Sequence, residues 1–73
     1  MHRSARNGMV GLVTDVACGP VVASVELVCG PHLVEAVVSA EAVRELGLKP
    51  GGLAVAVVKA TEVVVERVGC DLR

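Results

Sequence analysis

Val21-Val22-Ala23-Ser24-Val25-Glu26-Leu27-Val28 is the stretch that decides the fold. Side chains of an extended strand alternate between two faces, so Ala23, Val25 and Leu27 share one face. Glu26 lies on the other face, where a charged side chain can reach water. One apolar and one partly polar face predict a half-buried β-strand.

Turn signals stand on both sides of this strand. Cys18-Gly19-Pro20 precedes it and Cys29-Gly30-Pro31-His32 follows it, and glycine and proline are the residues that tight turns select. Val-rich apolar runs lie beyond each turn, at residues 8–17 and 33–38. We therefore expect three neighbouring strands joined by hairpins, the first bent at its glycines as small barrels require.

The apolar period changes at residues 39–47, which predicts a helix of about two turns. Ser39 is a suitable N-cap, Glu41 lies in the first turn where the helix dipole favours an acid, and Gly47 can adopt the left-handed conformation that ends a helix. The apolar side chains expected to pack on the sheet are Val43, Leu46 and Leu48.

Two more strands are expected after the helix. Lys49-Pro50-Gly51-Gly52 has proline and glycine in the positions that a type II turn demands. The run 53–58 is continuously apolar, so we expect it to be buried on both faces, and 63–67 reads as a last strand. The fold class is mainly β, an OB-fold-like five-stranded Greek-key barrel with one short helix between strands 3 and 4.

Length and composition favour one small domain that associates with copies of itself. The 73 residues are 53% hydrophobic with a mean hydropathy of +0.68. A chain this short buries little core alone, and soluble monomers rarely expose large apolar patches. We expect a single domain over residues 1–73, an ordered core over 4–67, a frayed tail over 68–73 and a homo-oligomer.

Several function classes are disfavoured. The net charge is −1 and aromatic residues are absent, so neither an electrostatic nor a stacking route to nucleic acid is available. The apolar run 53–58 is too short to span a membrane, and no export signal is visible, so we expect a cytoplasmic protein.

Nothing in the sequence indicates catalysis. No metal-ligand spacing or nucleophile–base arrangement occurs, so we expect no enzyme, no catalytic residue, no metal ligand and no cofactor. The three separate cysteines, Cys18, Cys29 and Cys70, are expected to be reduced thiols, and His2 and His32 are assigned no chemistry.

Two polar segments suit a small oxyanion. Ser4-Ala5-Arg6-Asn7 offers a hydroxyl, a guanidinium and four backbone amides that could curl into a nest, and Lys59-Ala60-Thr61 adds an ammonium and a second hydroxyl. The nearest acid is Glu62, which on a strand would face away from Thr61. Taken alone, such an arm is more often simply mobile and such a lysine simply solvated.

These segments together resemble a known family. Ser4-Ala5-Arg6-Asn7, the helix start at Ser39, the stretch 46–51 and the strand end 57–61 occur in the order found in molbindins, which are TOBE-like Mop domains that bind molybdate. The resemblance covers residues 4–67. It implies a free-standing module that stores or buffers molybdate or tungstate, because the sequence shows no helix-turn-helix and no phosphate-binding loop.

The resemblance also implies the site and the assembly. Stand-alone molbindins form hexamers, as trimers of dimers, with oxyanions at subunit interfaces. Carried over by position, the oxyanion ligands are Ser4, Ala5, Arg6, Ser39 and Lys59, with Ala60 and Thr61 as further ligands. Ala42 stands where some relatives carry another hydroxyl.

Two other functions stay open. The chain could be a protein-interaction module whose arm docks a partner, or a ligand sensor that works with a separate transporter or regulator subunit. Flat titration with molybdate would favour the first. A free dimer, in place of a closed hexamer, would favour the second.

Overall fold

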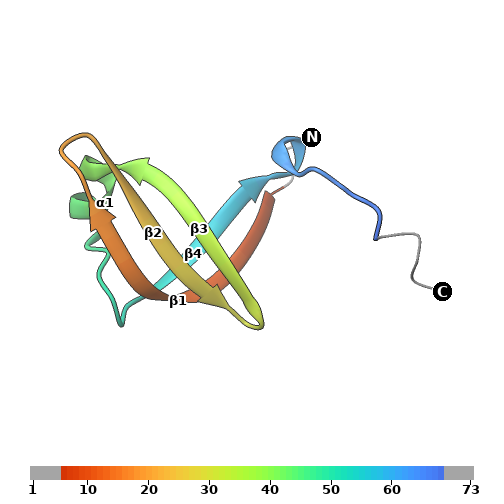
Figure 1. Ribbon diagram of the computed structural model, residues 1–73, viewed down its shortest axis with the longest axis horizontal. Coiled ribbons are helices and arrows are strands. Elements are labelled where there is room, and N and C mark those ends of the chain that lie inside the picture. The colour runs from red at the N-terminus through yellow and green to blue at the C-terminus, as the bar shows by residue number, and fades with distance from the viewer. Residues whose placement is uncertain (1–5, 69–73) are drawn as a thin grey trace.

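The computed structural model describes residues 6–68, which form one curled antiparallel sheet with two short helices (Figure 1). The elements are β1 (Arg6–Cys18), β2 (Val22–Cys29), β3 (His32–Ser39), α1 (Ala40–Leu46), β4 (Leu53–Lys59) and the 3₁₀ helix η1 (Ala60–Glu62). The strand order is β3-β2-β1-β4, so β3 and β4 are the two edges. The sheet closes only part of a barrel.

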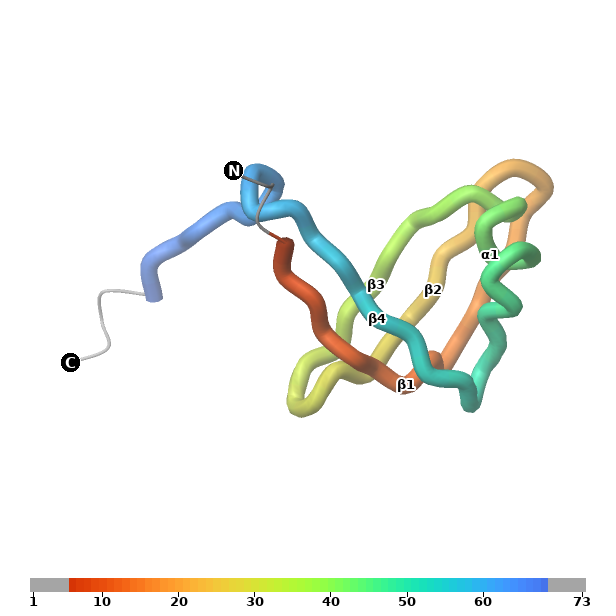
Figure 2. Tube along the Cα trace, turned by 180° about the vertical axis from the view of Figure 1, so that it is seen from behind, coloured from red at the N-terminus to blue at the C-terminus, as the bar shows by residue number. Residues whose placement is uncertain are grey.

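Strand β1 carries the bend that curls the sheet (Figure 2). Its first half, from Arg6 to Leu12, pairs with β4, and its second half, from Leu12 onward, pairs with β2. Leu12 therefore faces both Val28 and Leu53. Because one strand serves two partners in succession, the β1–β4 ribbon folds away from the β1–β2–β3 part of the sheet.

The core lies on the concave side of β1–β2–β3 and confirms the alternation expected for β2. Ala23, Val25 and Leu27 are all buried, and Glu26 is not. Val13 from β1 and Val43 from α1 complete the cluster together with Cys29. Small branched side chains fill this core, as the aromatic-free composition requires.

Helix α1 has the expected ends. The Ala42 N–H donates to Ser39 Oγ at 3.0 Å, and Gly47 adopts a left-handed φ of 65°. Val43 is buried and Leu48 packs against the core, but the expectation for Leu46 was wrong, since this side chain is 71% exposed. Leu46 borders an open groove of the half-barrel, where no further strand of residues 6–68 covers it.

The type II turn is confirmed. Gly51 has a φ of 93°, and the Gly52 N–H donates to the Lys49 carbonyl at 3.1 Å. The Gly51 N–H also donates to the Val13 carbonyl at 2.8 Å, which ties the turn to β1.

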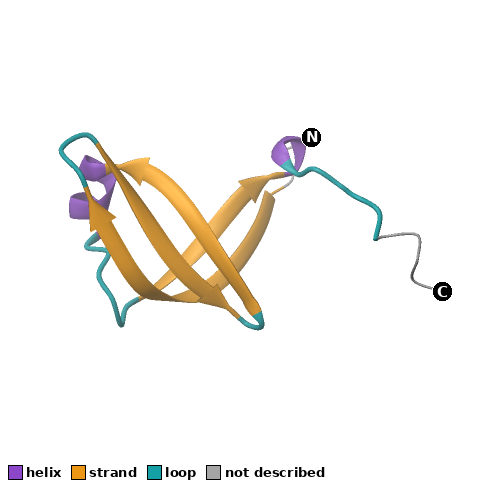
Figure 3. Ribbon diagram, viewed as in Figure 1, coloured by secondary structure: helices purple, strands orange, loops and turns teal. Residues whose placement is uncertain are grey.

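The expected fifth strand, residues 63–67, is absent from the described structure, which has four strands (Figure 3). After β4 the chain enters η1, and residues 63–68 then run away from the sheet with no strand pairing; Val64 and Val65 are 81% and 88% exposed. A valine-rich segment forms a strand only where a neighbouring edge accepts its backbone hydrogen bonds, and η1 directs this one away from its own sheet.

The expectation that 53–58 is buried on both faces was also wrong. Leu53 and Val55 are 75% and 56% exposed, because β4 is an edge strand and no element of the described residues covers its outer face. A continuous apolar run without such a layer leaves every second side chain in solvent.

Candidate functional site

Two cations lie directly opposite each other at the open end of the β1–β4 ribbon. Arg6 is the first residue of β1, Lys59 is the last of β4, and their Cα atoms are paired in the strand register. Directly opposed side chains share a face, with Cβ atoms about 4.5–5.5 Å apart. Like charges at that separation repel, so the pair is stabilised when an anion lies between them.

The 3₁₀ helix η1 adds polar groups beside this pair. Ala60 and Thr61 follow Lys59 directly, Lys59 has the extended backbone of an N-cap, and the Val63 N–H donates to the Ala60 carbonyl at 3.3 Å. Thr61 is exposed on this turn. Since Thr61 and Glu62 lie on a helical turn, the opposite-face relation expected of a strand does not apply to them.

The nest expected of residues 4–7 does not form at its described members. Arg6 and Asn7 are extended residues of β1, paired with Lys59 and Val58, and the Asn7 amide donates to the Val58 carbonyl at 3.4 Å. Ser4 and Ala5 lie outside the described residues. The ladder holds the Arg6 backbone in place and leaves its side chain exposed.

Ser39 is the last residue of β3 and the N-cap of α1, and α1 lies far from the end of the β1–β4 ribbon that carries η1 (Figure 1). Ser39 is paired with Val22, beside the end of β1, whereas Arg6 is at the start of this 13-residue strand. At about 3.3 Å per residue, β1 is roughly 40 Å long when measured along its bent path. No oxyanion a few ångströms across can contact Ser39 and Arg6 of the same chain.

The hydroxyl of Ser39 keeps a free donor in its capping role. Its oxygen accepts the hydrogen bond from the Ala42 N–H, and a hydroxyl that accepts one bond can still donate its own proton. The residue is exposed, so this proton is accessible from outside the chain.

Of the expected site residues, the structure thus brings together Arg6, Lys59, Ala60 and Thr61, and it separates Ser39 from them. Within residues 6–68 no group of three metal-ligating side chains is present, and Cys18 and Cys29 are free thiols. No helix in the described part of the chain is long and apolar enough to cross a membrane.

Comparison with known proteins identifies the family to which this chain belongs. The TOBE domain profile matches residues 3–65, nearly the whole chain. The chain belongs to the TOBE domain family. Two relatives of this TOBE domain are molybdenum-pterin-binding protein 2 of Clostridium pasteurianum, 39% identical, and a probable molybdenum-pterin-binding protein of Haemophilus influenzae, 41% identical. Each alignment covers 89% of this chain and 97% or 96% of the relative, respectively.

Solved structures share the fold. MopII from Clostridium pasteurianum superposes with a TM-score of 0.82 at 37% identity, over 90% of this chain and all of that one. A molybdate-binding protein from Sporomusa ovata gives 0.84 at 31% identity, over 92% and 100%. The cytoplasmic molybdate-binding protein ModG gives 0.73 at 44% identity, over 82% of this chain but 43% of that one. These relatives are named as binding proteins, not as enzymes.

Sequence reasoning missed one further feature, the apolar groove that Leu46 borders. Its walls come from β2, β3 and β4, from Leu46 at the end of α1 and from Leu48 in the segment that follows. The signal was present in the sequence: the run 53–58 offers more apolar surface than a single edge strand can bury.

Proposed function

We propose that this TOBE domain binds molybdate reversibly at a site shared between two chains. One chain supplies Arg6, Lys59, Ala60 and Thr61, with Ser4 and Ala5 before them, and another supplies Ser39. The observation that carries the proposal is the pairing of Arg6 with Lys59 on adjacent strands, while Ser39 lies near the opposite end of β1.

The donor set fits a tetrahedral dianion. A guanidinium donates through a planar fork and an ammonium through three rotatable protons, and backbone amides and hydroxyls supply the remaining directions. Sulfate carries the same charge as molybdate and tungstate but is smaller, so selection rests on the size of the site and on donor geometry. Tungstate is therefore expected to bind as molybdate does.

Binding without chemistry suits a storage or buffering role in the cytoplasm. The names of the relatives, molybdenum-pterin-binding and molybdate-binding proteins, support the oxyanion as ligand. A ligand held by two chains at once stabilises their association by mass action, so filling the site and assembling the oligomer reinforce each other. We infer a homo-oligomer, with the hexamer as the expected form.

Molybdenum analysis of the purified protein tests the proposal. The protein is passed through gel filtration in molybdate, and bound molybdenum is measured by mass spectrometry beside the Arg6→Ala, Lys59→Ala double variant. Stoichiometric molybdenum in the native protein, lost in the variant, is the expected result. The matched control is Lys49→Ala, which removes an exposed cation from the turn before β4 and should keep the metal. A folded native protein without molybdenum would contradict the proposal.

A further inference from the structure

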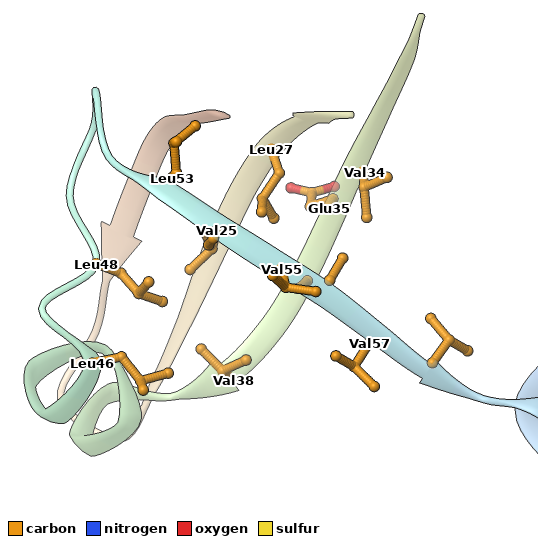
Figure 4. A pocket seen from close by; sticks show the side chains of 14 residues that line it. Val25, Leu27, Val34, Glu35, Val38, Leu46, Leu48, Leu53, Val55 and Val57 are labelled. Atoms are coloured by element: carbon orange, nitrogen blue, oxygen red, sulfur yellow. The ribbon is translucent and has the colours of Figure 1, made fainter. Parts of the chain in front are cut away.

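The two sides of the curled sheet carry different side chains. The concave side holds the core and the apolar groove, whose lining side chains are drawn in Figure 4. On the convex side of β1, β2 and β3 the side chains form rows, because directly opposed residues of paired strands share a face. Three rows follow one another in the strand register: Leu12-Val28-Leu33, Asp15-Glu26-Glu35 and Ala17-Ser24-Val37. None of these side chains is buried, so this convex face is open.

The first row is apolar and accessible. Leu12, Val28 and Leu33 are 43%, 38% and 65% exposed, and Val37, on the far side of the second row, is 73% exposed. Single apolar side chains on a surface are ordinary, but a row that crosses three neighbouring strands forms a contiguous apolar patch. Patches of this kind, bordered by polar residues, mark surfaces that contact other molecules.

The second row is acidic and uncompensated on its own face. Asp15, Glu26 and Glu35 are directly opposed across the three strands, and like charges in that arrangement destabilise a sheet. The Thr14 hydroxyl donates to Glu26 Oε1 at 2.8 Å, but this donor is neutral. From Leu12 onward, no described convex position of β1–β3 carries Lys, Arg or His. Conflicts with local rules of this kind are expected mainly at functional surfaces.

The charge of this face selects among possible occupants. Within residues 6–68 no group of ligating side chains could hold a metal ion, and nucleic acid would be repelled by the carboxylates. A protein surface with Lys or Arg between apolar side chains is complementary, since its cations can pair with the carboxylates while its apolar groups cover the neighbouring rows.

A second copy of this chain complements the face less well. Two of its cations, Arg6 and Lys59, are the proposed oxyanion ligands. Arg44 and Arg67 each stand next to a glutamate in the sequence, so both would bring a further negative charge to the acidic row.

We propose that the convex face of β1–β3 docks an amphipathic segment of another protein, in which Lys and Arg side chains lie between apolar ones. The apolar side chains of this segment cover the row that contains Leu33, and also Val37, while its cations pair with Asp15, Glu26 and Glu35. The docking goes beyond the proposed oxyanion binding and does not depend on it, because none of these residues is a proposed oxyanion ligand.

A synthetic peptide of Leu, Lys and Ala, designed as a helix of about five turns with Lys between two Leu stripes, serves as the probe. Its binding to the full chain is measured by fluorescence anisotropy. Glu26→Gln with Glu35→Gln removes two charges from the acidic row, and Glu41→Gln with Glu45→Gln removes the same charge from α1. We expect the first pair to weaken binding at least about tenfold and the second by less than about threefold. Equal weakening by the two pairs would reveal unspecific attraction and overturn the proposal.

The apolar row and the identity of the occupant are tested with the same probe. Leu33→Gln should weaken peptide binding at least about threefold, whereas Leu46→Gln, at a similarly exposed leucine outside this face, should leave it unchanged. Unchanged binding by Leu33→Gln would contradict the apolar contact. Sedimentation without peptide provides the remaining test. If Glu26→Gln with Glu35→Gln alters self-association, a second copy covers this face, and docking of a different protein is wrong.

Discussion

Gly11 allows β1 to approach β2 closely just before β1 changes partner at Leu12. A Cβ at this position would lie 2.5 Å from Cys29 Sγ and 3.0 Å from the Val28 carbonyl oxygen. The sulfur belongs to a buried side chain, and the carbonyl is part of the β2 backbone, so neither can move aside easily. The glycines at 8 and 11 predicted bending from the sequence, but only the structure shows which of them is in close contact.

Substituting Gly11→Ala should therefore destabilise the fold by about 1–3 kcal/mol, as overpacking of a close-packed core does. Gly8→Ala is the matched control in the same strand, because its Cβ would meet only Val55 Cγ1 at 3.5 Å, an ordinary contact. Denaturant unfolding followed by circular dichroism measures both. Equal free energies of unfolding for the two variants would show that Gly11 is not the tight position.

At the scale of elements, the sequence predicted those parts whose signals are local. The N-cap at Ser39, the left-handed Gly47 and the type II turn at Pro50-Gly51 each depend on a few adjacent residues, and all three are confirmed. The alternation of β2 also set its buried face correctly. What failed depends on neighbours: β4 was taken as buried and 63–67 as a strand, although neither has a covering partner within the described chain.

In the candidate site, too, the residue types could be predicted from the sequence, whereas their relative positions depend on the fold. The sequence predicted Arg6 and Lys59 as oxyanion ligands. The sheet places them together because β1 and β4 pair over seven positions. The remoteness of Ser39 could not be read from the sequence, since it depends on the length and direction of β1. The ligand roles of Ser4 and Ala5 stay predictions, because both residues lie outside the described structure.

Helix α1 allows the capping role of Ser39 to be separated from its proposed ligand role. Ser39→Ala removes the bond from the Ala42 N–H and should cost about 1 kcal/mol of stability. Ser39→Asp retains an N-cap acceptor, so stability should stay near that of the native protein, but its carboxylate would repel an oxyanion.

We therefore expect Ser39→Asp to unfold at a similar denaturant concentration to the native protein, yet to lose molybdate affinity at least tenfold in calorimetric titration. Glu41→Gln, which changes charge in the same first turn, serves as the control for long-range electrostatic effects and should bind normally. Unchanged affinity in Ser39→Asp would remove Ser39 from the proposed site.

At the scale of the whole molecule, the separation of Ser39 from Arg6 leads to a prediction that distinguishes a site shared between chains from a site built within one chain. If one chain supplies Arg6 and Lys59 and another supplies Ser39, two inactive chains can complement each other. The Arg6→Ala, Lys59→Ala chain keeps its Ser39, and the Ser39→Asp chain keeps both cations. In a mixed pair, one of the two shared sites then has the full native donor set, and the other lacks both cations and Ser39.

Refolding these two variants together should therefore restore molybdate binding to as much as half of the sites in mixed pairs, although each variant alone binds poorly. Bound molybdenum is measured after affinity isolation of assemblies that contain both chains, using a different tag on each. Because neither set of substitutions adds a hydrogen-bond donor for the oxyanion, recovered binding can come only from native donors of the two chains that meet across an interface. Mixed assemblies that bind no molybdenum would show that each site is built within one chain, and the shared-site geometry would have to be abandoned.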